Sequence, residues 1–411
     1  MEDLENFALR LKNVYSDQSH PPENLKKIMR YMKKAKHSGI KSATLALNYS
    51  TFKIFSEWCA IPFDDLTEDD ILNFLDYLND YTYTRGGKKS NYSDASIHTF
   101  KINLKKFFGT IGKPEIANVF KDRARKLEEI DRKDLLAKSE IESLIQAANN
   151  ARDKAIISTL YEAGCRRGEL LAVRIKDLDF NDNGVKVTFP KGKTGKRILQ
   201  LVYSASFLRA WCDVHPCRQE DGEPDPTAQL FVNLHGTIKK NGERVFDGLS
   251  EQGLYFQIQK IAKRINLKKK VNPHSFRHAR ATDLAEHMTE QQLKKFLGWT
   301  PNSAMASVYV HDPETDNAVL KMYGIETEKK QGNQLKVNRC PRCKDINPET
   351  SKFCGKCGLP LTQEAATTKE TTIADYVQRA ESDEILEMKR ELEKQREEVS
   401  KLRRTMLKAG K

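Results

Sequence analysis

The chain has 411 residues, and its 70 Lys and Arg residues exceed its 57 Asp and Glu residues, giving a formal net charge of +13. This length exceeds the roughly 100–200 residues of an ordinary domain, so we expect two or three folded units. The excess of basic residues favours a polyanionic partner such as nucleic acid. No apolar stretch approaches the ~18–20 residues that span a bilayer, which excludes a membrane-spanning protein. The first residues lack the apolar core of a signal peptide, so we expect a cytoplasmic protein.

The first unit is predicted to be helical. Apolar residues recur at i, i+3 and i+4 in residues 45–61, 69–81 and 96–111, which predicts three helices. We assign residues 23–120 to this unit and residues 1–22 to an N-terminal extension. The highly charged residues 121–135, which contain few apolar side chains, are predicted to be a linker.

A second unit is predicted over residues 136–325. Ser139 and Glu142 precede an apolar run with the spacing of a capping box, which predicts the start of a helix. Residues 184–202 place β-forming side chains on both sides of a Gly- and Lys-rich centre, as in a two-stranded hairpin. The fold class is therefore mainly α, with a small β-sheet in the second unit.

Five residues of the second unit could bind or attack a phosphate. Arg166 stands two residues after Gly164 at the start of a predicted helix, where amide groups and a guanidinium favour an anion. His274 and Arg277 are spaced i, i+3, so they share one helical face. Trp299 and Tyr309 lie further along the second unit, with Tyr309 ten residues after Trp299. Taken alone, each has a simpler explanation, namely a solvated surface group or an aromatic ring in the core.

The order of these residues resembles that of the tyrosine recombinase (phage integrase) family. The matching motifs are AGCRRGEL around Arg166, a lysine of the hairpin, His274-x-x-Arg277, LGW at Trp299 and VYVH at Tyr309. The resemblance covers about residues 25–325 and implies a SAM-like helical core-binding domain followed by an α-rich catalytic domain. Two positions depart from the common pattern of the family. Trp299 stands where the family usually has His, and Cys165 stands where it commonly has Leu.

The resemblance implies a site-specific recombinase or integrase that cuts and rejoins duplex DNA. Tyr309 would attack to give a 3′-phosphotyrosine, while His274 would act as a base or hydrogen-bond acceptor. A hairpin lysine would protonate the leaving 5′ oxygen, and Lys193 is favoured over Lys191. The implied catalytic set is Arg166, Lys193, His274, Arg277, Trp299 and Tyr309, and it requires no cofactor. Lys196 and Arg197 are expected to make ordinary phosphate contacts.

The expected partners are a double-stranded DNA recombination site and further copies of the chain, as a dimer on one site and a tetramer in synapsis. Two alternatives remain open at this point. A type IB topoisomerase-like enzyme would use similar chemistry as a monomer that relaxes supercoils. A zinc-ribbon DNA-binding regulator would bind without catalysis.

Four cysteines near the end of the chain have the spacing of metal ligands. Cys340 and Cys343 form one CxxC pair, and Cys354 and Cys357 form a second after ten intervening residues. Four thiolates close a tetrahedral site, so residues 336–362 are predicted to be a zinc ribbon with a structural zinc ion. A ribbon after the catalytic domain resembles archaeal members of the family, found on mobile elements.

The tail is predicted to be helical over residues 373–408. Apolar residues recur every seven positions at Ile385, Leu392, Val399 and Met406. This pattern is typical of a short coiled coil, and a single solvated helix is the alternative.

Overall fold

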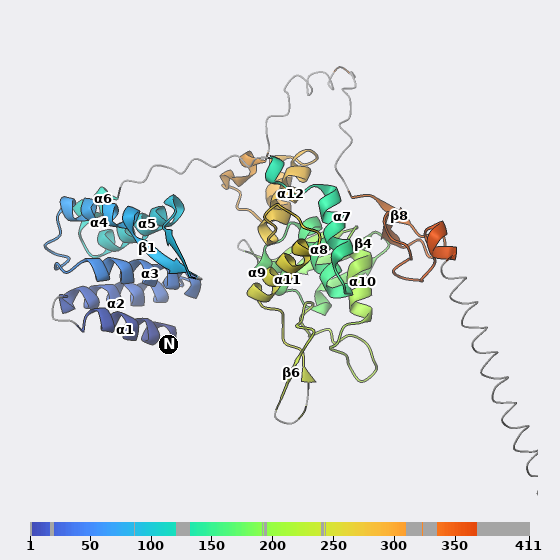
Figure 1. The fold of residues 1–411 in the computed structure, drawn as a ribbon, viewed down its shortest axis with the longest axis horizontal. Coiled ribbons are helices and arrows are strands. Elements are labelled where there is room, and N and C mark those ends of the chain that lie inside the picture. Colours follow the sequence, from blue (N-terminus) through green and yellow to red (C-terminus); the bar gives the residue numbers. More distant parts are fainter. Residues whose placement is uncertain are drawn as a thin grey trace, which may run out of the picture. The chain divides into compact units, whose positions relative to one another are not determined.

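The computed structural model describes residues 2–16, 20–85, 87–120, 132–190, 192, 195–239, 242, 244–309, 323 and 335–367. The chain divides into two compact units, residues 1–126 and 127–411 (Figure 1). The predicted tail helix lies outside the described residues, as do residues 121–131 of the predicted linker. Within these described ranges, no helix is both long and apolar enough to cross a membrane.

The first unit is built mainly of helices around an aromatic core. They are α1 (Glu2–Val14), α2 (Pro22–His37), α3 (Ser42–Trp58), α4 (Glu68–Asp80), α5 (Asp94–Thr110) and α6 (Pro114–Val119). Helices α3, α4 and α5 confirm the three predicted from periodicity. Phe52 and Phe107 meet in the core with ring centroids 4.9 Å apart. Helix α1, from the predicted extension, shares this core, because Phe7 stacks on Tyr49 at 4.6 Å and Leu11 is buried.

A β-hairpin that was not predicted interrupts the first unit between α4 and α5. Strand β1 (Thr82–Arg85) pairs antiparallel with β2 (Lys88–Asn91). The sequence carried a signal for it, since Gly86-Gly87 between β-forming residues is a common hairpin connection. Gly87 adopts a φ of 78°, which favours glycine.

The second unit packs its helices around α8. Its helices are α7 (Lys138–Ala147), α8 (Ala151–Ala163), α9 (Arg167–Leu171), α10 (Ala205–Asp213), α11 (Glu251–Arg264), α12 (Pro273–Ala285) and α13 (Glu290–Leu297), with short 3-10 turns η1 (Arg132–Asp134), η2 (Ile175–Asp177) and η3 (Ala304–Val308). Helix α8 is buried along most of its length and contacts α7, α10 and α12. The buried Glu162 accepts hydrogen bonds from the backbone N–H groups of Val202, Tyr203 and Ser204, which joins α8 to the start of α10.

The predicted capping box of Ser139 and Glu142 was wrong. Helix α7 begins earlier, at Lys138, and Glu140 accepts a hydrogen bond from the Ala137 backbone N–H at 2.7 Å. Ser139 therefore lies within the first turn, where its side chain cannot cap the helix. Glu140, three positions after Ala137, caps the helix instead.

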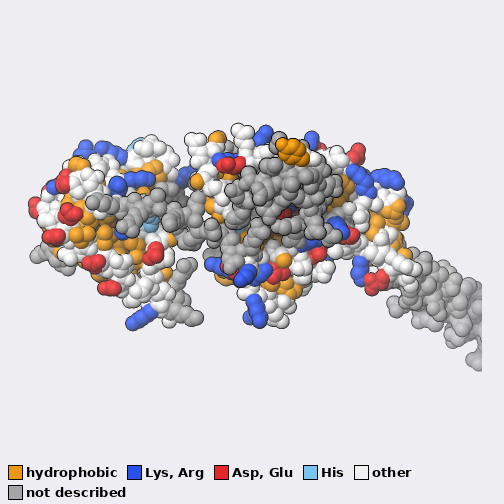
Figure 2. All heavy atoms as spheres, turned by 90° about the horizontal axis from the view of Figure 1, so that it is seen from above, with side chains coloured by type: hydrophobic (Ala, Val, Ile, Leu, Met, Phe, Trp, Pro, Cys, Tyr) orange, Lys and Arg blue, Asp and Glu red, His pale blue; other side chains and the backbone are white. Residues whose placement is uncertain are grey.

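The predicted hairpin of residues 184–202 is confirmed as part of a three-stranded antiparallel sheet. Strands β3 (Leu178–Asn181), β4 (Gly184–Phe189) and β5 (Arg197–Leu201) lie in the order β3-β4-β5, with Phe189 opposite Arg197. Two further pairs are short: β6 (Thr237–Ile238) with β7 (Arg244–Val245), and β8 (Val337–Arg339) with β9 (Ile346–Pro348). Lys and Arg side chains are visible on the surface of both units in Figure 2, in keeping with the basic composition.

Candidate active site and candidate metal centre

Arg166 lies at the junction of two helices. Helix α8 ends at Gly164, which adopts the left-handed conformation, and Arg166 is the N-cap residue of α9. Gly164 has a φ of 52°, which favours glycine, and a Cβ there would lie 2.8 Å from Leu297 Cδ2. The Arg166 guanidinium donates to Glu169 at 2.6 Å and to the carbonyl of Gly298 at 3.2 Å and 3.3 Å. These bonds fix its orientation in the folded chain.

Arg277 joins the two chain segments that hold the site. It lies on α12, is 5 % exposed, and donates to the carbonyls of Gly164 and Leu297, each at 2.7 Å. Burial and the neighbouring charges of Arg166 and Arg197 lower the pKa of Arg277 to about 10. The group is therefore still cationic at neutral pH. Two guanidinium groups are held close together, as binding of a single phosphate requires.

A carboxylate balances this positive charge. Glu169 accepts from Arg197 at 2.7 Å and from Arg166, and its side chain is 3 % exposed. Burial opposes its ionisation, but the adjacent arginines prevail and lower the pKa of Glu169. Arg197 also donates to the carbonyl of Phe296 and lies over the Phe189 ring at 4.9 Å. The Arg197 side chain, 9 % exposed, is thus part of the site's buried support, whereas a phosphate contact had been expected.

Trp299 and Tyr309 stack on each other beside Arg277. Their ring centroids are 5.6 Å apart with planes 17° apart, and the Arg277 guanidinium lies 5.4 Å from the centroid of the Trp299 ring. Helix α13 ends at Gly298 in the left-handed conformation, which turns the chain toward Trp299. Tyr309 follows η3 and is 4 % exposed, and this burial raises the pKa of Tyr309 to about 12.

The hydroxyl of Tyr309 contacts a histidine that was not among the predicted site residues. Nδ1 of His278 lies 2.5 Å from the Tyr309 oxygen. His274 lies one turn earlier on α12, is exposed, and its ring centroid is 6.3 Å from that of His278. Partial burial and the charges of Arg277, Arg167 and Arg166 lower the pKa of His274. The run His274-x-x-Arg277-His278 held the signal for His278, since residues four apart share a helical face.

Lys191 and Lys193 lie outside the described residues, so the choice between them stays a prediction. Strands β4 and β5 on either side of these lysines are described, and Gly192 and Gly195 of the connecting loop exchange backbone hydrogen bonds at 3.1 Å and 3.3 Å. Lys196 is exposed.

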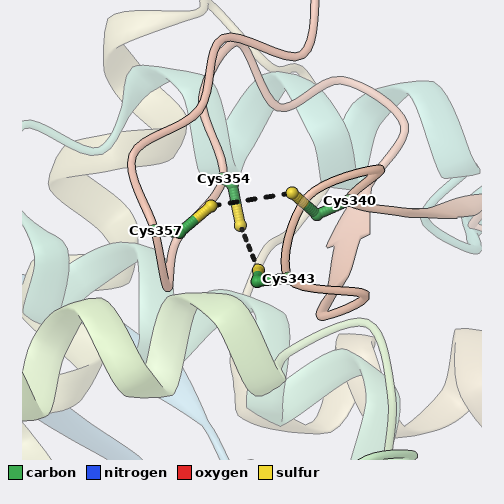
Figure 3. A group of neighbouring side chains, drawn as sticks. All are labelled: Cys340, Cys343, Cys354 and Cys357. Carbon is green, nitrogen blue, oxygen red and sulfur yellow. Dashed lines mark hydrogen bonds between the residues drawn. The ribbon is translucent and has the colours of Figure 1, made fainter.

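The four cysteines come together as predicted from their spacing. Their sulfur atoms all lie within 4.8 Å of one another, with Cys340 and Cys357 3.7 Å apart and Cys343 and Cys354 3.5 Å apart (Figure 3). Four sulfurs at ~2.3 Å from a tetrahedral zinc ion would be about 3.8 Å apart, so this donor set fits such an ion.

Two loops with the same backbone pattern present these sulfurs. In the first, the Cys340 N–H donates to the Asp345 carbonyl at 2.8 Å, and Lys344 N–H donates back to Cys340 at 2.9 Å. In the second, the Cys354 N–H donates to the Leu359 carbonyl at 2.8 Å, and the Gly358 N–H donates to the Cys354 carbonyl at 3.0 Å. The equivalent residues Lys344 and Gly358 have positive φ values of 60° and 67°. This repetition is typical of a pair of metal-binding knuckles.

A buried amide links the two loops. Asn347 is 0 % exposed, and its side-chain oxygen accepts from the Gly355 N–H at 2.9 Å. Its amide nitrogen lies 3.5 Å from Cys354 Sγ. Asn347 therefore orients the second loop toward the sulfurs of the first, as groups next to metal ligands commonly do.

The cysteine segment packs on α10 and the β3–β4 turn of the same unit. Arg209 of α10 lies over the Phe180 ring at 4.4 Å and 3.7 Å from the Asp345 carboxylate. Arg339 donates to the Asp182 carbonyl at 3.2 Å. A Cβ at Gly355 would lie 3.3 Å from that of Ser206, so the second loop approaches α10 closely.

Comparisons with known proteins agree with this geometry. Residues 134–315 match the phage integrase family. The chain is 30 % identical over 195 residues to a tyrosine recombinase of Thermosipho africanus, covering 46 % of this chain and 62 % of that protein. It is 28 % identical over 264 residues to tyrosine recombinase XerA of Pyrococcus horikoshii, covering 64 % and 82 %. The match to the Thermosipho protein thus spans less than two thirds of its length.

The fold resembles that of a solved recombinase. A crystal structure of the XerH site-specific recombinase bound to its difH substrate, in a pre-cleavage complex, aligns with a TM-score of 0.51 and 17 % identity. The alignment covers 79 % of this chain and 95 % of that one. At this identity the likeness establishes the helix-rich fold with small sheets.

Proposed function

We propose, from the match of residues 134–315 to the phage integrase family, that the protein is a site-specific tyrosine recombinase. It cuts and rejoins duplex DNA through a 3′-phosphotyrosine at Tyr309. The observation that carries the proposal is the bridge made by Arg277 between the Gly164 and Leu297 carbonyls. This bridge ties together the segments that lead to Arg166 and Trp299, and Tyr309 stacks on Trp299.

Each residue of the site has a part in phosphoryl transfer. Arg166 and Arg277 neutralise the charge that develops on the non-bridging phosphate oxygens, and Trp299 donates its indole N–H to one of them. His274, exposed in the first turn of α12, completes the predicted set at the phosphate. Lys193, or Lys191 in its place, gives a proton to the departing 5′ oxygen. The phosphotyrosine conserves the phosphoester bond, so a second 5′ hydroxyl can rejoin the strand without ATP.

The cysteine cluster is proposed to be a structural zinc site. Cys340, Cys343, Cys354 and Cys357 would hold the ion as four thiolates, which leaves no position for substrate. When bound, the ion would tie the two loops together and supply folding free energy. With zinc bound, this segment would be a zinc ribbon after the integrase-like domain. On this ground and on the likeness to the Pyrococcus protein, we infer an archaeal type of mobile-element recombinase.

The partner is a double-stranded DNA recombination site. The net charge of +13 supports this choice, because neutralising phosphates supplies much of the affinity for DNA. Strand exchange between two duplexes needs several protomers, so the working form is a dimer on each site and a tetramer in synapsis. The predicted coiled coil of residues 373–408 would raise their effective concentration.

A covalent adduct tests the function. The 411-residue chain is incubated with a supercoiled plasmid carrying the DNA that flanks its gene, the reaction is stopped with SDS, and protein bound to DNA is recovered. We expect a phosphotyrosine adduct from the wild-type chain and none from Tyr309→Phe, which removes only the nucleophilic oxygen and leaves DNA binding intact. An adduct that survives in Tyr309→Phe contradicts the assignment. Exchange of strands between two linear duplexes separates a recombinase from a topoisomerase-like enzyme.

A further inference from the structure

We propose that His278 takes the phenolic proton of Tyr309 during strand cleavage and returns it during rejoining. The inference rests on the proposed recombinase function. It assigns a residue outside the predicted catalytic set and gives to His278 the role of base that the resemblance had implied for His274. Its basis is direct contact with the reacting atom, because Nδ1 of His278 lies 2.5 Å from the Tyr309 oxygen. The two rings also pack with centroids 5.9 Å apart and planes 30° apart, which limits how far the hydroxyl can turn away.

Tyr309 needs such a partner. Only 4 % of the residue is exposed, and burial raises the pKa of Tyr309 to about 12 although the charge of Arg277 acts in the opposite direction. A phenol with this pKa is almost wholly protonated at neutral pH and is then a weak nucleophile. Removal of its proton as the bond to phosphorus forms overcomes this barrier.

The surroundings of His278 keep it ready to accept a proton. Its half-buried ring lies on α12, and the charged or titratable groups that face it are His274 and Arg277 on α12 and Tyr309 after η3. Burial, then His274 and Arg277, lower the pKa of His278. The imidazole is therefore neutral at pH 7, and with its proton on Nε2 it presents Nδ1 as an acceptor.

The proton balance is symmetric over the two steps. In cleavage, Tyr309 Oη bonds to phosphorus, the bond from phosphorus to the 5′ oxygen breaks, the phenolic proton moves to His278 Nδ1, and the hairpin lysine gives a proton to the 5′ oxygen. In rejoining, the 5′ hydroxyl returns its proton to the lysine, and Tyr309 leaves with the proton from His278. The adjacent Arg277 disfavours the imidazolium, which promotes return of the proton.

His274 is the matched comparison. It lies four residues earlier on the same helix and is exposed, whereas His278 makes the described hydrogen bond to Tyr309. Single-turnover formation of the adduct on a nicked suicide substrate, made from the plasmid site that wild-type protein cleaves, is measured for His278→Ala, His278→Gln and His274→Ala. We expect both His278 variants to bind the DNA normally and to cleave ~10²- to 10⁴-fold more slowly, the usual contribution of a general base.

The pH dependence separates proton transfer from simple positioning. Since His278 must be neutral to act, wild-type cleavage should rise with pH through the titration of His278 and then level off. Both His278 variants should lose this acid-side inflection, including His278→Gln, which keeps a hydrogen-bond acceptor but cannot take a proton. His274→Ala should also cleave more slowly, because His274 belongs to the proposed phosphate site, but it should retain the inflection. A wild-type rate and pH profile in His278→Gln would overturn the proposal and leave the recombinase function standing.

A measurement on the free protein keeps the two hypotheses distinct. The ¹⁵N chemical shifts of the His278 ring in the intact chain, assigned by comparison with His278→Gln, report which nitrogen carries the proton. We expect Nδ1 to be unprotonated at pH 7.5 and its shift to move in Tyr309→Phe, where the hydroxyl is lost. A proton on Nδ1 would overturn the proposal whether or not an adduct forms, while absence of an adduct in the wild type would contradict the proposed function.

Discussion

The arginine–tyrosine site and the four-cysteine cluster both gather polar side chains at one point, but by different means. Arg166, Arg277 and Tyr309 come from α9, α12 and the end of η3, and backbone carbonyls hold the two guanidinium groups. The cysteines come from two short loops with the same hydrogen-bond pattern. The first site is therefore assembled by the packing of a whole unit. The second is arranged by local chain geometry and would be closed by a metal ion.

The largest expected effect concerns the general acid, which would complete the packed site. Lys193→Ala should slow cleavage ~10²- to 10⁴-fold, because the 5′ oxygen then leaves without a proton. Replacing the bridging 5′ oxygen by sulfur makes the leaving group far less dependent on a proton, so this substrate should restore the rate of Lys193→Ala. Rates are measured in single turnover with both substrates. Rescue of Lys191→Ala, with Lys193→Ala unaffected, would move the role to Lys191.

The second expected effect tests whether packing holds the site. Arg277→Ala should lower cleavage ~10²- to 10³-fold, as expected when one donor to the transition-state oxygens is lost. It should also reduce the free energy of unfolding by roughly 1–3 kcal/mol, because the Gly164 and Leu297 carbonyls lose their donor in a buried site. Cleavage kinetics and urea unfolding measure the two losses.

Arg174→Ala is the matched control for Arg277. Arg174 also donates to a backbone carbonyl, that of Thr227, at 2.6 Å, but it is exposed. Its removal should change neither the cleavage rate nor the stability by much. Equal cleavage by Arg277→Ala and Arg174→Ala would mean that Arg277 is not part of the phosphate site.

Removal of the metal ion tests the four-cysteine cluster. The purified chain should contain one zinc ion, and Cys340→Ser with Cys343→Ser should lose it, while Cys217→Ser should keep it. A ligand that binds only the folded state at 1,000 times its Kd stabilises that state by about 4 kcal/mol, so loss of zinc should lower the thermal midpoint. Elemental analysis and calorimetry measure these effects. Zinc content below a tenth of an ion per chain in the wild type would contradict the ribbon.

The smallest expected effect concerns the contact between the cysteine segment and α10. Gly355→Val should retain zinc but push the second loop away from Ser206, because the added Cβ would lie 3.3 Å from that residue's Cβ. We expect a loss of about 1 kcal/mol in unfolding free energy, near the average for single substitutions. The exposed Lys356→Ala serves as the control. An unchanged stability in Gly355→Val would show that the cluster and α10 are energetically independent.

Local patterns were sufficient for much of the fold and for the cysteine cluster. Periodicity predicted α3, α4 and α5, and the Gly- and Lys-rich centre predicted the pairing of β4 with β5. The CxxC spacing predicted the cluster because all four ligands lie within eighteen residues of chain. The predicted capping box at Ser139 failed because two acidic residues compete for the same helix start, and the spacing alone does not show which one is used.

The sequence by itself determined the order and spacing along the chain of Arg166, His274, Arg277, Trp299 and Tyr309 and of the four cysteines, and these spacings predicted the two sites. The tertiary structure alone decided which side chains support that set. It paired Glu169 with Arg197 across α9 and β5, and it placed His278 at the Tyr309 hydroxyl. These contacts join residues tens of positions apart, and only the packing of the elements that carry them sets the distances between them.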